Sequence, residues 1–190
     1  NTLSYFETAQ LTATANTGFD FDCWKINKSI TYDVQVGNSV IEPSNNKLLI
    51  DGQESPQLTL IRGFTYVFQV DVGDGNEFFI STSSYNNDTF ADEFTSGILN
   101  SRISNGTLIF QVPMDAPNTL YYASSQIPFA GNTLKIITRS DAEILPSAKS
   151  STINPTMLAD LSFEAVFKNK EYDLSVTATE GGEVNFTSGS

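Results

Sequence analysis

The side chains that could perform chemistry are few in kind. The chain has 190 residues, no His, a single Cys (Cys23), and 22 Asp and Glu against 10 Lys and Arg. Without imidazole, a Ser-His-Asp triad, a His general base and a His-ligated metal are all excluded. One Cys can form neither an intrachain disulfide nor a thiolate zinc site. The net charge of −12 argues against binding to nucleic acids and to anionic membrane surfaces.

Oxygen-bearing side chains are therefore the only candidate metal ligands. Asp71, Asp74 and Asn76 lie in one short stretch that could offer calcium part of the roughly six to eight oxygens it needs. The stretch lacks the EF-hand pattern, and an acidic solvated turn is the simpler interpretation. A second oxygen-rich cluster consists of Asn86, Asn87, Asp88, Asp92 and Glu93.

Candidates for catalysis are weaker still. Asp20 and Asp22 could act as paired carboxylates, but they alternate along an expected strand and so should face solvent. Ser124 and Ser125 lack a His partner and a nucleophile-elbow motif. We therefore expect no catalytic residues and no enzyme activity, and we interpret Cys23 as a small apolar packing residue.

Strands are the elements that must position these side chains. Alternating polar and apolar residues, bounded by Gly, Pro, Asn or Asp, predict strands at 10–15, 19–24, 31–36, 57–61, 66–70, 77–81, 107–112, 119–122, 133–138, 161–167, 172–179 and 183–186. This spacing predicts an all-β sandwich or barrel. Short helices are candidates at 89–94 and 154–160, and the Ser-, Ala- and Pro-rich segment 140–154 is interpreted as a linker. No apolar run is long enough to span a membrane.

Both ends of the chain carry a family resemblance. Residues 172–184 (YDLSVTATEGGEV), 11–24 (LTATANTGFDFDCW) and 161–168 (LSFEAVFK) resemble successive parts of an internalin-type B-repeat, in permuted order. The resemblance implies a module made of residues 1–31 and 155–168. The permuted order also implies that the chain is one period of a longer pattern. The chain is then either a slice of a tandem array or a subunit whose hairpin at 171–190 completes the next module.

A physical argument supports completion by a neighbour. A two-stranded hairpin is marginally stable alone, and only Asn169 and Lys170 separate its first strand from the preceding one. A chain that runs straight on carries the hairpin away from its own sheet, which favours head-to-tail, non-closing assembly with copies of itself. The residues expected at this contact are Tyr172, Leu174, Val176, Ala178, Val184 and Phe186 on the hairpin, and Leu11, Ala13, Phe19 and Phe21 on the receiving module.

The middle of the chain resembles a cupredoxin-like domain, over residues 32–139. The matching segments are YDVQV (32–36), LIDG (49–52), PQLTLIRGFTYVF (56–68), VP (112–113) and APNTLYY (116–122). The resemblance implies a β-sandwich, here inserted into the B-repeat-like module.

The copper ligands of that family are missing. A type 1 site needs two imidazoles, a thiolate and usually a thioether. The family pattern places its two His, its Cys and its Met at Asn76, Gln126, Ala123 and Phe129 of this chain. Copper is therefore excluded, no cofactor is expected, and calcium at Asp71, Asp74 and Asn76 is the one remaining metal candidate.

The sequence thus predicts an all-β protein, a cupredoxin-like sandwich inserted into a small B-repeat-like module. The expected function is structural: a building block of an extracellular filament or giant repeat surface protein, joined head to tail by strand completion. The alternative is an adhesin or a virion or tail-fibre module that binds a glycan or receptor through the sandwich loops at 72–76, 83–106 and 123–132.

Overall fold

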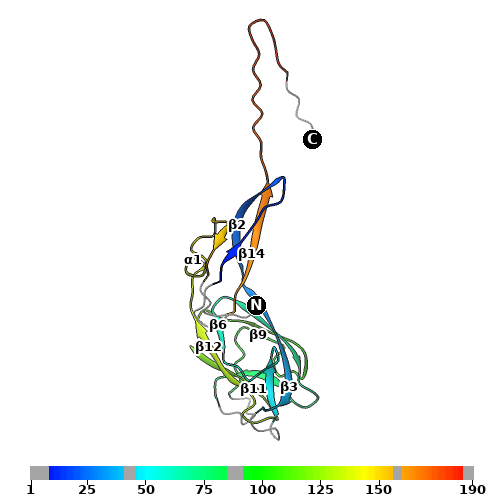
Figure 1. The fold of residues 1–190 in the computed structure, drawn as a ribbon. Helices are drawn as coiled ribbons and strands as arrows, with labels where there is room; N and C mark the ends of the chain where they lie inside the picture. The colour runs from blue at the N-terminus through cyan, green and yellow to red at the C-terminus, as the bar shows by residue number, and fades with distance from the viewer. Residues whose placement is uncertain (1–8, 41–45, 85–91, 156–159, 186–190) are drawn as a thin grey trace.

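The computed structural model describes residues 9–40, 46–84, 92–155 and 160–185. Three parts follow one another along its length (Figure 1). A β-sandwich forms one end, a small β module lies in the middle, and the C-terminal segment extends from that module as a long loop. The parts differ in how much of their apolar surface is covered.

The sandwich consists of two sheets. The larger sheet has the order β5-β4-β3-β7-β10-β9 and contains β3 (Ser29–Asn38), β4 (Asn46–Ile50), β5 (Gln53–Glu54), β7 (Thr65–Asp71), β9 (Ile98–Leu99) and β10 (Asn105–Gln111). The smaller has the order β6-β12-β11-β8 and contains β6 (Leu58–Ile61), β8 (Phe78–Ser81), β11 (Thr119–Ser124) and β12 (Asn132–Ile137). The β3·β7 and β12·β6 pairs are parallel, and the other pairs are antiparallel.

The core lies between these two sheets. On β7, Tyr66, Phe68 and Val70 are buried and alternate with more exposed residues, as a half-buried strand requires. The Phe68 ring bridges the layers, since its centroid lies 5.5 Å from that of Tyr32 and 5.3 Å from that of Phe78. The all-β sandwich predicted from the alternating pattern is confirmed.

Three buried tyrosines predict a loss of stability in alkali. The hydroxyl of Tyr32 donates to Asp160 at 2.6 Å, that of Tyr122 donates to the Pro56 carbonyl at 2.7 Å, and that of Tyr66 accepts from the Ile61 amide at 2.9 Å. Burial raises the pKa of all three phenols above the ordinary value of 10.0. The folded state therefore keeps three protons that the unfolded chain releases.

Stability from these tyrosines is complete below pH 10 and falls as pH rises from 10 toward the raised pKa values of the folded state. At pH 11 the expected loss is about 1.4 kcal/mol per tyrosine, or roughly 4 kcal/mol in all. Urea unfolding followed by circular dichroism between pH 8 and pH 11.5 measures it. A urea midpoint that stays level to pH 11 would contradict the burial of these hydroxyls.

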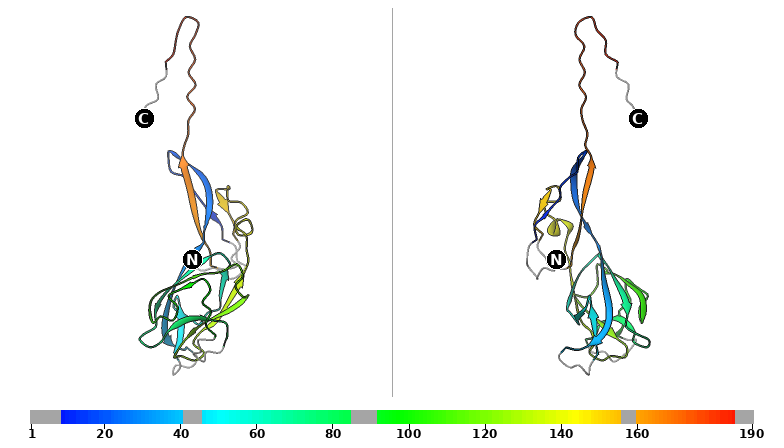
Figure 2. Two further views of the ribbon diagram at one scale, coloured as in Figure 1. Left: turned by 180° about the vertical axis from the view of Figure 1, so that it is seen from behind. Right: turned by 45° about the vertical axis from the view of Figure 1, so that its right-hand side comes forward.

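The small module is built from two strand pairs. The first pair joins β1 (Leu11–Thr12) to β13 (Thr152–Ile153), and the second joins β2 (Phe19–Asn27) to β14 (Ser162–Asn169) with a bulge at Val166/Phe167. Figure 2 shows β2 and β14 side by side, with the β1·β13 pair to one side of them. Trp24 of β2 is buried between the pairs, against Leu145 and Ile153.

The segment 140–154 is not the linker that its composition suggested. It begins with α1 (Asp141–Ile144), which has a capping box formed by Ser140 and Glu143. It continues through Leu145 and Ile153, which belong to the Trp24 cluster, and includes β13. The Trp24 amide donates to the Ala148 carbonyl at 2.8 Å. The segment packs on the module because its few apolar residues, Leu145 and Ile153, lie in the Trp24 cluster.

The sandwich connects to the module at one end of the β2·β14 pair. Only Lys28 separates β2 from β3, and its carbonyl accepts from the Thr65 amide at 2.7 Å. On the returning side β12 leads into α1, and Asp141 at the start of α1 forms an ion pair with Lys28 at 2.8 Å. The chain thus leaves and re-enters the module at neighbouring residues, the arrangement that domain insertion requires.

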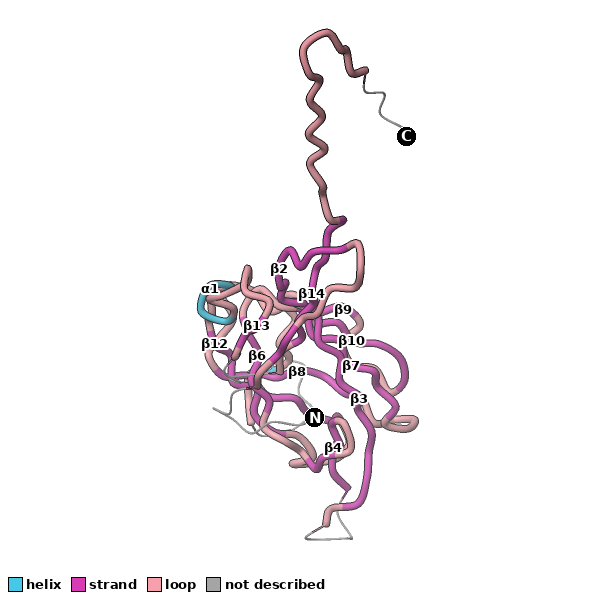
Figure 3. The backbone as a smooth tube through the Cα atoms, turned by 45° about the horizontal axis from the view of Figure 1, so that its top comes forward, coloured by secondary structure: helices cyan, strands magenta, loops and turns pink. Residues whose placement is uncertain are grey.

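The C-terminal segment is extended but unpaired. Its turn falls at the predicted Gly-Gly step, with Gly181 at φ +87° and the Gly182 amide donating to the Thr179 carbonyl at 3.1 Å (Figure 3). Over residues 171–185 neither arm of the hairpin belongs to a sheet, so the predicted strand at 172–179 is not formed. The predicted strand at 183–186 is likewise absent over 183–185. A strand needs a partner for its backbone, and the described part of this chain offers these arms none. Phe186 lies outside the described residues, as do most of the two candidate helices.

Candidate assembly interface

The hairpin presents one apolar row to solvent. Tyr172 is 77% exposed, Leu174 68%, Val176 49% and Val184 49%. Along the first arm these apolar residues and Ala178 alternate with Asp173, Ser175, Thr177 and Thr179. Such alternation is typical of a strand whose one face is buried. Here every residue from 171 to 185 is exposed. The apolar face of the first arm, which such a pattern would normally bury, is therefore open to solvent.

The root of the hairpin is fixed in direction. The Lys170 amide donates to the Gly18 carbonyl at 2.9 Å, which continues the β2·β14 ladder by one step. The Lys170 ammonium then lies over the Tyr172 ring, 5.5 Å from its centroid. These contacts set the chain on a straight course away from the module, as Figure 1 shows.

The residues predicted to receive a hairpin lie in two different environments. Leu11 and Ala13 are half-buried against the Trp24 cluster. Phe19 is 46% exposed, and the half-buried Phe21 packs edge-on against Phe167 of β14 at 6.0 Å between ring centroids. Within the described chain none of these residues is covered by the hairpin.

Phe167 was not among the residues predicted from the sequence, although it lies close to Phe21 in a further apolar row. Phe163, Ala165 and Phe167 alternate along β14, and they face Ile26, Trp24 and Phe21 across the ladder. Alternation in LSFEAVF could have identified this row. Its end near the hairpin is uncovered, because Phe167 is 38% exposed.

The positions of the lost copper ligands do not fit a type 1 copper. Asn76, Gln126 and Phe129 lie in sandwich loops, and Ala123 lies in β11. Asn76 uses its side-chain amide to donate to the Val72 carbonyl at 3.0 Å. Ala123 is a buried methyl, Phe129 is an exposed ring, and Gln126 is exposed. None of these side chains is an imidazole, a thiolate or a thioether, so the donor set is wrong for copper.

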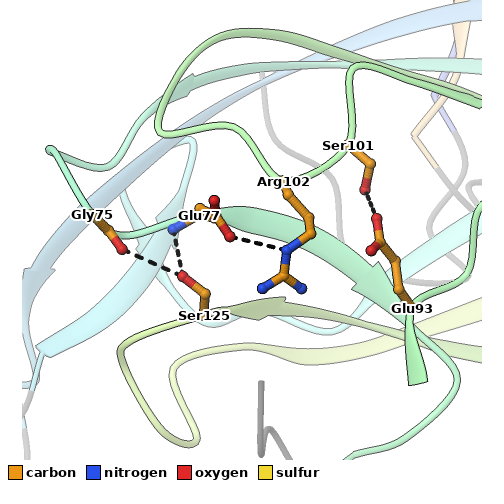
Figure 4. A network of polar contacts seen from close by, with 6 residues as sticks. All are labelled: Gly75, Glu77, Glu93, Ser101, Arg102 and Ser125. Carbon is orange, nitrogen blue, oxygen red and sulfur yellow. Dashed lines mark hydrogen bonds and ion pairs between the residues drawn. The ribbon is translucent and has the colours of Figure 1, made fainter. Parts of the chain in front are cut away.

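A polar network joins the same loops (Figure 4). The Ser125 hydroxyl accepts from the Glu77 amide at 3.0 Å and donates to the Gly75 carbonyl at 3.4 Å. Arg102 donates through Nε to Glu77 at 2.9 Å and lies over the Phe79 ring, 4.6 Å from its centroid. Sequence reasoning missed this ion pair, because its partners are far apart in sequence and follow no local pattern.

The calcium candidates are dispersed. Asp71 ends β7, Asp74 lies on the following turn, and the Asn76 amide group is engaged with Val72. The described ranges contain no group of three or more His, Cys, Asp or Glu that could hold a metal ion. The second cluster lies mostly outside those ranges. Calcium binding stays an untested prediction.

Of the paired carboxylates and serines, Asp22 and Ser125 have hydrogen-bond partners that hold them in structural roles. Asp22 accepts from Lys149 at 3.3 Å, and this hydrogen bond holds the pKa of the Asp22 carboxyl below its ordinary value. Asp20 is exposed at the register position of Lys168. Ser124 is buried in β11, and Ser125 belongs to the loop network. Cys23 is half-buried and donates weakly to Asp22.

Comparison with known families gives a match at the N-terminal part of the chain. Residues 3–50 match the divergent InlB B-repeat domain. The B-repeat predicted from residues 11–24 is therefore confirmed at the N-terminal part of the chain, and the match extends through β3 to the end of β4. A B-repeat is a type of domain found in surface proteins, so this chain carries a surface-type repeat module. No helix of the described ranges is long and apolar enough to cross a bilayer.

Solved structures resemble the chain only distantly. Lac15 from a marine microbial metagenome is 19% identical with a TM-score of 0.37, covering 58% of this chain and 32% of Lac15. A Campylobacter jejuni multicopper oxidase, a metallo-oxidase, is 12% identical with a TM-score of 0.37, covering 74% and 30%. The McoA multicopper oxidase 2F4 variant from Aquifex aeolicus is 13% identical with a TM-score of 0.32, covering 67% and 32%. The chain thus spans about a third of each structure. No curated protein sequence matches it significantly.

Proposed function

We propose that this chain is a structural building block that assembles head to tail, with the hairpin of one copy completing the B-repeat module of the next. The observation that carries the proposal is the bare apolar row Tyr172, Leu174 and Val176 on an arm whose backbone is unpaired. An exposed strand of this kind gains hydrogen bonds and burial only by joining another sheet. B-repeats are domains of surface proteins, which supports an extracellular location of this chain, in a filament or a repeat surface protein.

A head-to-tail contact cannot close by itself. The donor surface is the hairpin and the acceptor surface is the module, so a unit that has bound one neighbour still offers a free surface of the other kind. The products are therefore chains of increasing length rather than a single dimer. The high net charge of −12 keeps the flanks of such a chain soluble.

Sedimentation velocity of the 190-residue chain over a range of concentrations tests this function. We expect species at successive multiples of 20.8 kDa, whose share grows with concentration. A chain that remains a 20.8 kDa monomer up to millimolar concentration would overturn the proposal. A mass that stops at the dimer would point instead to a symmetric contact between two hairpins.

Ligand binding by the sandwich is the second candidate function. A groove of about 720 Å³ beside β6 and β12 is lined by Arg62, Lys135 and Arg139, and none of its lining residues is acidic. Three of the chain's 10 cations thus lie around one concavity of a strongly acidic protein. This favours an anionic ligand, such as a carboxylated glycan of a receptor. The two functions are compatible, because the hairpin and the groove use different parts of the molecule.

A further inference from the structure

We propose that the hairpin of one copy binds to the outer edge of β14 in a second copy. This inference rests on the proposed function and names the receiving strand, which the resemblance to B-repeats did not assign. Three features point to β14: the direction of its backbone groups, the pattern of its side chains and the course of the chain after Asn169.

The backbone of β14 has four residues whose polar groups point away from β2. The Trp24 amide donates outward to the Ala148 carbonyl, so Trp24 and its register partner Ala165 form a non-hydrogen-bonded pair. Strand alternation gives Phe163, Phe167 and Asn169 the same outward direction as Ala165. The Lys170 amide bonds to Gly18 on the β2 side, as expected for a residue of the opposite parity.

These outward groups have no backbone partner among the described residues. The β14·β2 pair is a two-stranded sheet with β14 at its edge, and both views in Figure 2 show that edge open along most of its length. A strand edge with free amides and carbonyls is a template for another strand. The module therefore offers a site for strand addition beside its own core.

The first arm of the hairpin matches this edge in length and in pattern. β14 spans Ser162–Asn169, and the arm Tyr172–Thr179 is equally long. On β14 the row of Phe163, Ala165 and Phe167 lies on the face that packs on the Trp24 cluster. A strand added at the edge sets its own apolar row beside this one, and the exposed ring of Phe167 is then covered.

The arm does not fold back on the β14 of its own copy. Such a return needs a tight turn at Lys170 and Glu171, and two-residue hairpin turns require positive φ, typical of Asn and Gly. Neither residue has a positive φ, and the Lys170–Gly18 hydrogen bond holds the chain on its straight course. The edge of a second copy is therefore the acceptor.

A proline at Ala165 tests the assignment. Ala165→Pro removes an outward amide and places a ring at the edge, but leaves the hydrogen bonds to β2 intact. We expect self-association to weaken roughly 100-fold, since at least one interchain hydrogen bond is lost and strand docking is obstructed. The conservative variant Ala165→Ser keeps the amide and is expected to associate like the parent chain.

Mixing two defective chains gives the decisive result. Ala165→Pro retains a working hairpin, and Val176→Asp retains a working β14 edge. Each alone is expected to stay monomeric, whereas an equimolar mixture forms a 1:1 complex and nothing larger. If the parent chain associates and Ala165→Pro associates equally well, β14 is not the acceptor. If the parent chain does not associate at all, the proposed function itself fails.

Hydrogen exchange of the parent chain keeps the proposal testable even if the proline variant misfolds. The amides of Phe163, Ala165 and Phe167 are expected to exchange more slowly as concentration rises through the association range. The amides of Glu164 and Val166, which already bond to β2, are expected to change little. Equal protection of the two sets, or none, would overturn the assignment.

Discussion

Val176→Asp is expected to abolish assembly while leaving the monomer folded. Val176 is 49% exposed on an arm that makes no ladder in the described chain, so the substitution costs the isolated fold almost nothing. In the assembled state the same position lies in the apolar row, where a carboxylate would lose its hydration. The lost burial of Val and the cost of the charge together amount to at least about 3 kcal/mol, or more than roughly 100-fold in affinity.

The matched control is Thr177→Asp. It adds the same charge to the adjacent residue, on the opposite side of the arm, and so gives the same net charge as Val176→Asp. Sedimentation velocity is expected to show the parent distribution for Thr177→Asp and monomer for Val176→Asp. Equal loss in both variants would indicate that charge repulsion, rather than a buried apolar face, governs association.

Trp24→Ala is expected to unfold the module without unfolding the sandwich. Trp24 is the buried centre of the small cluster, and its ring lies 6.0 Å from that of Phe21. Removing a buried Trp side chain typically costs about 3–5 kcal/mol, a large share of the stability of so small a core. Calorimetry is expected to show a retained sandwich transition and a missing module transition, and self-association is lost with the acceptor.

Trp24→Phe is the control for this result. The indole Nε1 of Trp24 is buried and has no hydrogen-bond partner among the described residues, so replacing Trp24 by Phe removes no hydrogen bond seen there. Its expected cost is less than half that of Trp24→Ala, and association survives. A thermogram of Trp24→Ala that matches the parent would show that the cluster does not hold the module together.

Local patterns predicted the strands that pack within the chain. The run Tyr66 to Val70 alternates and is bounded by turn residues, and β7 forms there with its apolar residues inside. The capping box of Ser140 and Glu143 was also visible in the sequence, but the Ser- and Ala-rich composition concealed it within an apparent linker. The average composition of a segment indicates how polar it is as a whole. It does not show whether a few apolar residues within it pack into a core.

Contacts between distant residues escaped prediction for a different reason. Leu11 pairs with Ile153 across most of the chain, and Arg102 meets Glu77 from another loop. Neither contact is reflected in a periodic pattern of residues in the sequence. The hairpin shows the opposite case: its alternation predicts strands, and the structure leaves them unpaired because a ladder cannot form without a second strand.

The place of the sandwich in the chain has a mechanical consequence. The sandwich is inserted between Lys28 and Asp141, at the end of the β2·β14 pair that is remote from the hairpin. In a filament joined by the proposed contact, load enters each unit at the edge of β14 and leaves through that unit's own hairpin, which follows β14 directly along the chain. The load therefore passes along the covalent backbone of β14, and neither β2 nor the sandwich lies in its path. The tensile strength of such a filament would be set by the contact between the hairpin and β14, and the sandwich would be carried as an unloaded side group.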